Sequence, residues 1–216
     1  MSGPTPTLVL ATRNKKKGEE MIHLICPPWE PSPRLARLRI ASLDAFPAAP
    51  EVVEDADTFP GNARKKATET ATALSCWVVA DDSGLAVDVL GGAPGVHSAR
   101  YAGTHGDDAA NNRRLLAELA EVDDEHRGAA FVCALALCDP TGTVRAEVQA
   151  SCRGRIVRQP RGSGGFGYDP LFLIPEYHKT FGELSPLVKS QLSHRARAFT
   201  RLRPMIEALI SQGALG

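Results

Sequence analysis

The sequence predicts an α/β fold built on a mixed β-sheet. Short apolar, β-branched runs alternate along the chain with segments of helical pattern, which is typical of parallel strands joined by helices. Two of these runs, 129–138 and 144–151, are separated only by a turn at 139–142, and this hairpin makes the sheet mixed rather than purely parallel. The 216 residues, 43% of them hydrophobic, can supply the core of one large domain.

Charge and cysteine content argue against several classes of protein. Lys and Arg together number 25, as do Asp and Glu, so no global charge favours nucleic acid or acidic membranes. The five cysteines form no Cys-x-x-Cys pair and lie partly in apolar runs, which favours reduced thiols in a cytoplasmic protein. No apolar run is long enough to cross a membrane, and residues 1–6 lack the pattern of a signal peptide.

The first elements of the chain are a strand, a helix and a weak second strand. Residues 7–12 are largely apolar, as expected for a strand buried on both faces. A helix over 15–26 ends at the prolines of 27–33, and a strand follows at 39–43. The acidic, Pro-containing segment 45–57 is predicted to be a loop.

Helices and strands then alternate to the end of the chain. Residues 58–76, rich in Ala and Lys, predict a helix capped by Thr58 or by the residue before it. The later elements are a helix over 107–119, a loop over 155–165, a strand over 166–174 with a turn at its head, and a helix over 193–209 capped by Ser193.

Two adjacent carboxylates, Asp81 and Asp82, come where the apolar strand that begins at Val78 is expected to end, because Ser83 and Gly84 indicate a turn. Adjacent acids repel each other unless a cation or backbone N–H groups stabilise one of them. Because Mg²⁺ takes one or two carboxylates and completes its shell with substrate phosphates, the pair indicates a metal–phosphate site. An Asx turn at the end of the strand would explain the same residues without a ligand.

A second candidate site is the segment 12–17, Thr-Arg-Asn-Lys-Lys-Lys, where the first strand leads into a helix. The N–H groups and the dipole of a helix start favour an anion, and lysines add positive charge for a polyphosphate. The glycines of a Walker loop are missing. A solvated basic first turn is the alternative interpretation.

The segment 162–170 places four glycines around Phe166 and Tyr168. Glycine allows a ligand to approach the backbone closely, and an aromatic face can stack on a base. Asp169 can accept hydrogen bonds or hold a cation. A bulged hairpin with core aromatic residues is the alternative.

Charged residues elsewhere offer further contacts. Lys189, His194 and Arg195 form a cluster of donors that suits a carbonyl-rich base edge or a phosphate, although a capped helix with solvated charges would look the same. Either Glu54 or Asp55 can supply a second carboxylate to a metal. No motif for acyl transfer is present. The carboxylates, lysines, glycines and aromatic loop together fit a nucleoside polyphosphate with a divalent ion.

Four separated motifs in order resemble those of the inosine/xanthosine triphosphate pyrophosphatases, the noncanonical purine nucleotide (dITP/XTP) pyrophosphatase family. The matching blocks are 11–17 with Glu20, 58–63 with Lys66 and Ala67, the long block 80–103, and 164–172 with Lys189 and 193–196. The resemblance covers nearly the whole chain.

The resemblance implies hydrolysis of ITP, dITP or XTP to the monophosphate and pyrophosphate, which removes noncanonical nucleotides from the pool. It further implies Mg²⁺, a homodimer in the cytoplasm, and no nucleic-acid or membrane partner. The implied fold is a single domain over 1–216, in which a long curved mixed sheet flanked by helices joins two lobes with the nucleotide in the cleft between them.

The resemblance also implies roles for individual residues. Asp82 would accept the proton from water and bind Mg²⁺ together with Glu54, and a metal beside Asp82 would keep it ionised. Lys17 would be the main phosphate lysine and a catalytic residue. The residues that would bind substrate are Thr12, Arg13, Asn14, Lys15, Lys16, Lys17, Ser83, Phe166, Gly167, Tyr168, Asp169, Lys189, His194 and Arg195.

Two departures from the family pattern and two other functions stay open. The segment before Thr58 is one residue shorter than usual, which leaves Glu54 and Asp55 as competing metal ligands, and the Pro-rich stretch 27–33 is unusual. A nucleotide-binding regulatory module without hydrolysis is one alternative function. The other is nucleic-acid binding through the arginines between 153 and 161. No residue that excludes GTP is evident.

Overall fold

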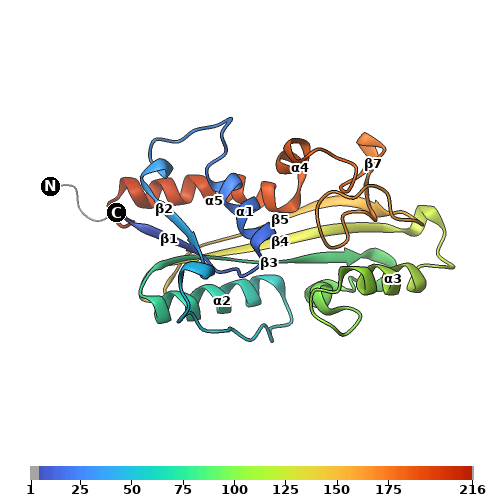
Figure 1. The fold of residues 1–216 in the computed structure, drawn as a ribbon, viewed down its shortest axis with the longest axis horizontal. Coiled ribbons are helices and arrows are strands. Elements are labelled where there is room, and N and C mark those ends of the chain that lie inside the picture. The colour runs from blue at the N-terminus through green and yellow to red at the C-terminus, as the bar shows by residue number, and fades with distance from the viewer. Residues whose placement is uncertain (1–4, 216) are drawn as a thin grey trace. The chain divides into compact units, whose positions relative to one another are not determined.

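The computed structural model describes residues 5–215, and within them it contains a seven-stranded mixed β-sheet (Figure 1). The strands are β1 (Thr7–Leu10), β2 (Arg39–Ser42), β3 (Trp77–Val87), β4 (Gly128–Cys138), β5 (Val144–Ile156), β6 (Phe172–Ile174) and β7 (Lys179–Thr180), and their order is β2-β1-β3-β4-β5-β6-β7. β1 is parallel to β2 and β3, whereas β6 is antiparallel to β5 and β7. The predicted α/β fold with a mixed sheet is therefore confirmed. Residues 1–4 and 216, which the predicted single domain includes, lie outside the described residues.

The α-helices among the described residues are α1 (Lys15–Ile25), α2 (Phe59–Leu74), α3 (Asp108–Glu118), α4 (Pro186–Leu192) and α5 (His194–Ser211). Side-chain caps begin most of them. The Thr58 hydroxyl accepts from the N–H of Gly61 at the start of α2, and the Ser193 hydroxyl accepts from the N–H of Ala196 at the start of α5, as predicted. α4 was not predicted from the sequence.

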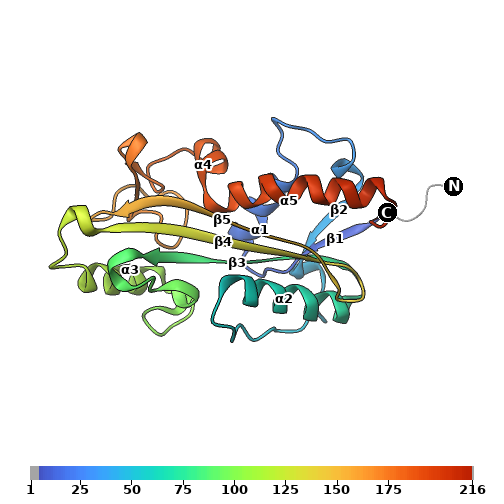
Figure 2. The same ribbon diagram turned by 180° about the vertical axis from the view of Figure 1, so that it is seen from behind.

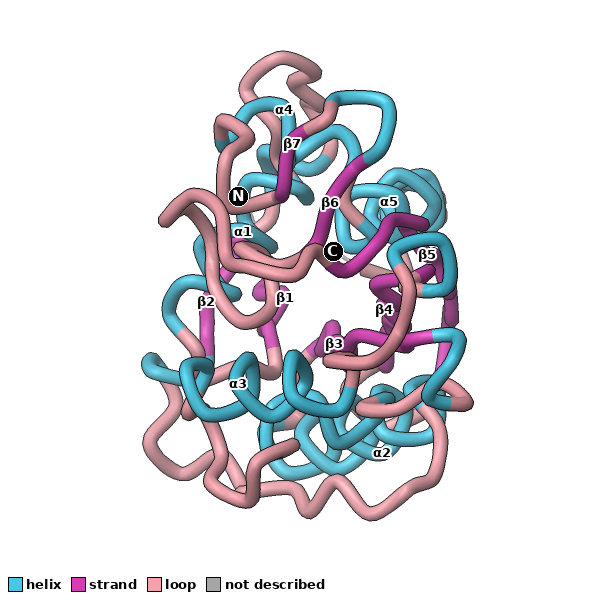
Figure 3. Tube along the Cα trace, turned by 90° about the vertical axis from the view of Figure 1, so that its right-hand side faces the viewer, coloured by secondary structure: helices cyan, strands magenta, loops and turns pink. Residues whose placement is uncertain are grey.

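The chain divides into two compact units, and one of them contains residues 5–82, 134–150 and 198–215. In this unit α2 covers one face of the strands, while α1 and α5 cover the other face (Figures 2 and 3). Ala63, Ala67 and Ala71, spaced four residues apart, form the buried side of α2 and pack with Val78 and Ala80 of β3. Because alanine is small, the helix can approach the sheet closely above the residues that follow in β3.

The other unit contains residues 83–133 and 151–197. Its core joins Leu115 and Leu119 of α3 to an aromatic cluster in which the ring centroids of Phe131 and Phe172 are 4.6 Å apart. Arg127 is fully buried nearby, and its guanidinium donates hydrogen bonds to backbone carbonyls, including that of Ile156 at 2.8 Å.

The predicted end of a strand at Asp81 and Asp82 is wrong. β3 continues through both carboxylates and through Ser83 and Gly84 to Val87. The apolar residues after Gly84 are buried in a core, and their burial stabilises the continued strand more than a turn would. The carboxylates therefore lie in the middle of a strand.

The ends of three other strands differ from the prediction. β5 extends to Ile156 because the alternation of buried and exposed residues continues past 151. β6 starts only at Phe172, since the residues from 167 to 171 form turns. β1 ends at Leu10, two residues before the predicted boundary.

All five cysteines are free thiols, as predicted. No helix in the described range 5–215 has the length and apolar character needed to span a membrane.

Candidate functional site

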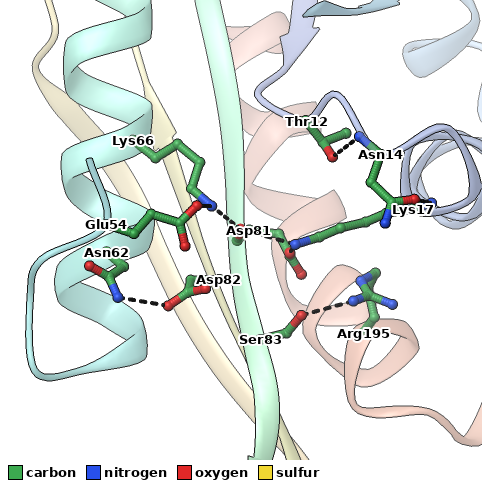
Figure 4. Close-up of polar contacts among 10 residues, drawn as sticks. All are labelled: Thr12, Asn14, Lys17, Glu54, Asn62, Lys66, Asp81, Asp82, Ser83 and Arg195. Atoms are coloured by element: carbon green, nitrogen blue, oxygen red, sulfur yellow. Dashed lines mark hydrogen bonds and ion pairs between the residues drawn. The ribbon is translucent and has the colours of Figure 1, made fainter. Parts of the chain in front are cut away.

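Asp81 and Asp82 lie at the centre of β3 and point to opposite sides of the strand (Figure 4). Successive residues of a strand face opposite directions, so a single strand presents one carboxylate to α1 and the other to α2. Both residues are buried, with 1% and 6% of their surface exposed. Buried carboxylates require charge partners or hydrogen bonds, and the structure supplies both.

Two lysines surround Asp81. The ammonium group of Lys17 forms an ion pair with the Asp81 carboxylate. Lys66, from α2, donates to the backbone carbonyl of Asp81 at 3.1 Å and pairs with the Glu54 carboxylate at 2.6 Å. The two ammonium groups and the carboxylates of Glu54 and Asp81 thus form one cluster of alternating charge (Figure 4).

The start of α1 positions Lys17. The Asn14 side chain caps the helix by accepting from the N–H of Lys17 at 3.1 Å, and the Thr12 hydroxyl accepts from the N–H of Asn14 at 3.2 Å. Lys17 turns inward, whereas Lys15 and Lys16 are exposed to solvent. The predicted phosphate segment therefore brings one of its three lysines to the carboxylates.

Arg13, from the same segment, is exposed and donates to the carbonyl of Ala49 at 2.8 Å.

Asn62 of α2 holds Asp82. Its amide nitrogen donates to Asp82 Oδ2 at 3.1 Å, and its amide oxygen accepts from the N–H of Ala56 at 2.9 Å. The side chain is 1% exposed, so both bonds are shielded from water. Asn62 and Lys66 were not predicted as site residues, although both lie in the block 58–67 that resembles the family motif. The sequence of this block indicates a helix and does not show which side chains face Asp82.

The electrostatic environment of Asp82 is unfavourable to its charge. The pKa of Asp82 is raised to about 6, mainly because the carboxyl group is buried. The positive charge of Lys66 lowers this pKa, and the negative charge of Glu54 raises it further. For Glu54 burial acts in the same direction, but the charge and hydrogen bond of Lys66 outweigh it and lower the pKa of Glu54. A cation beside Asp82 would lower its pKa.

The structure separates Glu54 from Asp55. Glu54 faces Lys66 and contributes to the electrostatics of Asp82, whereas Asp55 is exposed and pairs with Lys65 at 2.6 Å. Of the two candidates, Glu54 is the one that lies with the carboxylates of β3.

The carboxylates near β3 offer few ligands to a metal ion. Within residues 5–215 no group of three or more His, Cys, Asp and Glu side chains is arranged to hold a metal. Glu54 and Asp82 supply two carboxylates, which fits Mg²⁺ because that ion commonly takes one or two carboxylates together with substrate phosphates and water.

In the unit that begins at residue 83, Ser83 and the first turn of α5 lie together. Arg195 is buried and donates to the Ser83 hydroxyl at 2.8 Å (Figure 4). His194 is buried beside it and stacks on Phe131, with the ring centroids 4.8 Å apart. Ser83 follows Asp82 directly in β3.

Lys189, Phe166 and Asp169 form a second group in the same unit. Lys189 pairs with the buried Asp169 carboxylate at 2.6 Å and lies 4.9 Å from the centre of the Phe166 ring. The Arg195 guanidinium is 5.7 Å from the same ring. The Asp169 carboxylate also accepts from the N–H of Phe166 at 2.8 Å. Gly165 must be glycine because a Cβ there, at φ +76°, would collide with this carboxylate.

The remaining two predicted residues of this loop point elsewhere. Tyr168 is buried in the core, and its hydroxyl donates to the carbonyl of Ser98 at 2.9 Å. The N–H of Gly167 donates to Asp108 of α3. Phe166 and Asp169 therefore lie with Lys189 and Arg195, while Tyr168 and Gly167 anchor the loop.

The sequence and the fold are similar to those of known proteins. The sequence matches the Ham1 family over residues 8–205. A dITP/XTP pyrophosphatase from Rhodopirellula baltica is 52% identical over 207 residues, which are 96% of each chain. The solved structure of a HAM1 protein from Coxiella burnetii has a TM-score of 0.81 at 34% identity and covers 94% of this chain and 99% of its own. A solved nucleoside-triphosphatase, dITP/XTP pyrophosphatase from Mycobacterium abscessus, has a TM-score of 0.72 at 43% identity and covers 92% and 99% of the two chains.

Proposed function

Because this chain belongs to the Ham1 family, we propose that it hydrolyses noncanonical purine nucleoside triphosphates, namely ITP, dITP and XTP, to the monophosphate and pyrophosphate. The observation that carries the proposal is the cluster in which Lys17 and Lys66 surround the buried carboxylates of β3. Two ammonium groups together with the carboxylates of Glu54 and Asp82 suit a triphosphate and a divalent ion better than a peptide or a sugar.

The start of α1 binds the triphosphate in this proposal. The helix N-terminus and Lys17 attract the phosphates, with Thr12 and Asn14 fixing the backbone of the turn. Glu54 and Asp82 would hold Mg²⁺, which would supply positive charge to the phosphates and to the leaving pyrophosphate. In the substrate complex Lys17 exchanges its carboxylate partner for a phosphate.

Asp82 accepts the proton of the attacking water. Asn62 orients the carboxylate by donating to Oδ2. Lys66 holds Glu54 in place and keeps positive charge near Asp82. Attack of the water oxygen on the α-phosphorus breaks the bond to the β-phosphate and releases pyrophosphate.

The residues of the other unit recognise the nucleoside. Phe166 offers a face for stacking the base, and Lys189, His194 and Arg195 donate hydrogen bonds to a 6-oxo purine. The buried position of Arg195 supports this role, since a buried donor discriminates strongly against a ligand that cannot accept from it.

We also propose that the enzyme is a homodimer in the cytoplasm and that it binds neither nucleic acid nor membrane. The resemblance to the family supports the first point, and the equal numbers of acidic and basic residues support the second.

A substrate panel with Mg²⁺, scored for pyrophosphate release, tests the function. We expect ITP, dITP and XTP to be hydrolysed and Asp82→Asn to abolish turnover while leaving nucleotide binding largely intact. Binding of ITP to the parent without release of pyrophosphate would instead support a regulatory module. Salt-dependent binding of RNA or DNA without hydrolysis would support the nucleic-acid alternative. Near-parental activity in Asp82→Asn would remove Asp82 from the mechanism.

A further inference from the structure

Two side chains of α3 bind the backbone N–H and the backbone carbonyl of Gly167. Its N–H donates to Oδ2 of Asp108 at 2.7 Å, and its carbonyl accepts from the amide nitrogen of Asn112 at 3.1 Å. Asp108 and Asn112 are four residues apart and therefore lie on the same side of the helix. Both side chains therefore form hydrogen bonds with the same residue of the loop between β5 and β6.

Packing and hydrogen bonds fix α3, the helix that carries Asp108 and Asn112. Leu115 is fully buried in the core of the unit. Asn111 accepts from the N–H of Ala102 at 2.7 Å and donates to the carbonyl of Ala99 at 3.3 Å, which ties α3 to the preceding segment. α3 is thus a fixed support for the loop.

The orientation of Asn112 is determined by its surroundings. Its amide nitrogen faces the carbonyl of Gly167, while its amide oxygen is buried without a hydrogen-bond partner within residues 5–215. The opposite orientation of the amide would place two oxygens against each other, so the bond to the carbonyl of Gly167 fixes the side chain.

The conformation of Gly167 explains why the loop needs these two hydrogen bonds. Its φ of +62° lies in the left-handed region, and a Cβ at this position would meet nothing within 4 Å. Glycine is required here by the backbone and not by crowding. Because glycine is also the most flexible residue, external contacts must fix its peptide groups for Phe166 to keep its place beside Lys189.

We propose that Asp108 and Asn112 are positioning residues for nucleoside recognition, which act by fixing Gly167 and through it the ring of Phe166. The inference rests on the proposed function. It assigns to α3, which contributes no predicted site residue, a part in the affinity for the base but none in the handling of the phosphates.

The experiment compares Asp108→Ala and Asn112→Leu with the parent. We expect each variant to raise the KM for ITP by about five- to tenfold, the effect of one lost hydrogen bond, while kcat changes less than about twofold. The inhibition constant of inorganic pyrophosphate should stay at the parental value. Asp108→Asn keeps an acceptor oxygen for the N–H of Gly167 and should restore the KM.

Asp107→Ala is the matched control. Asp107 caps the same helix by accepting from the N–H of Ala110 at 2.9 Å. Its loss should lower the melting temperature without raising the KM for ITP. An equal rise in KM in Asp107→Ala, or an equal loss of affinity for pyrophosphate in Asp108→Ala and Asn112→Leu, would show that α3 acts only through general stability and would overturn the proposal.

Hydrogen–deuterium exchange of the peptide that contains Gly167 gives a readout that does not depend on activity. Exchange should be faster in Asp108→Ala than in the parent or in Asp107→Ala, all without nucleotide. If the parent fails to hydrolyse ITP, the proposed function is wrong even when this exchange result holds. If the parent hydrolyses ITP and both KM and exchange are unchanged in Asp108→Ala, the positioning role is wrong.

Discussion

We expect the Asp82→Asn variant to be more stable than the parent at pH 8 in the absence of divalent ions, although it should be inactive. Asp82 is 6% exposed, and burial raises its pKa from 3.8 to about 6. Above pH 6 the folded protein therefore holds a charge that the unfolded chain solvates better. Asparagine removes this charge, and its side-chain oxygen can still accept the hydrogen bond from Asn62.

The sign and size of the effect follow from proton linkage. Between pH 3.8 and about 6 the folded state binds more protons at Asp82 than the unfolded state, so the free energy of unfolding falls as the pH rises through this window. The difference of about two units between the two pKa values corresponds to a loss of about 3 kcal/mol in the free energy of unfolding. This loss is complete above the window and absent below it. For a chain of this size that equals roughly 6–12 °C in melting temperature.

Thermal unfolding in EDTA at pH 8 and at pH 4 measures the effect. The gain of Asp82→Asn should be large at pH 8 and vanish toward pH 4. Asp55→Asn is the control, because Asp55 is exposed and the hydrogen bond of Lys65 lowers its pKa, so its neutralisation should give no gain. A variant that is less stable than the parent at both pH values, or equally stabilised at both, would refute the reasoning.

Three further predictions concern single side chains. Lys17→Ala should weaken ITP binding by at least about tenfold, while Lys15→Ala, at an exposed position, should change it little in the same titration; small, equal losses would indicate a solvated basic turn. The parent should prefer ITP over ATP by roughly a hundredfold in kcat/KM, since a 6-amino group leaves buried donors unpaired, and Arg195→Ala should reduce that ratio. If Arg195→Ala kept the full preference for ITP over ATP, Arg195 would have no part in base recognition. Gly142→Ala should lower the free energy of unfolding by at least about 1 kcal/mol in urea with kcat unchanged, because φ is +83° and a Cβ would collide with Thr72; parental stability would contradict this.

Local sequence patterns predicted the parts of the site that depend on local structure. A strand that leads into a helix predicted the helix start within 12–17, and α1 does begin in this segment, at Lys15. The carboxylates of Asp81 and Asp82 were identified, but their position in the middle of β3 was not. Burial of the residues after Gly84 decides that strand, and burial is a tertiary property.

Tertiary contacts explain the residues that sequence reasoning did not find. Asn62 and Lys66 fit a helix equally well whether they face solvent or Asp82, so periodicity carries no information about their partners. Tyr168 and Phe166 are both aromatic residues in a glycine-rich loop, yet one is buried in the core and the other lies beside Lys189. α4 spans only seven residues, which is too short for a helical pattern to stand out.

The sharing of β3, β4 and β5 between the two compact units has a consequence for folding cooperativity. Neither unit has a linker at which it can be cut from the other, because each long strand begins in one unit and ends in the other. Loss of either core would release strands on which the other core depends, so partial unfolding brings little gain in chain entropy before the second core is lost. We therefore expect one transition in calorimetry, with the calorimetric enthalpy equal to the van't Hoff enthalpy, and no stable half-molecule on limited proteolysis.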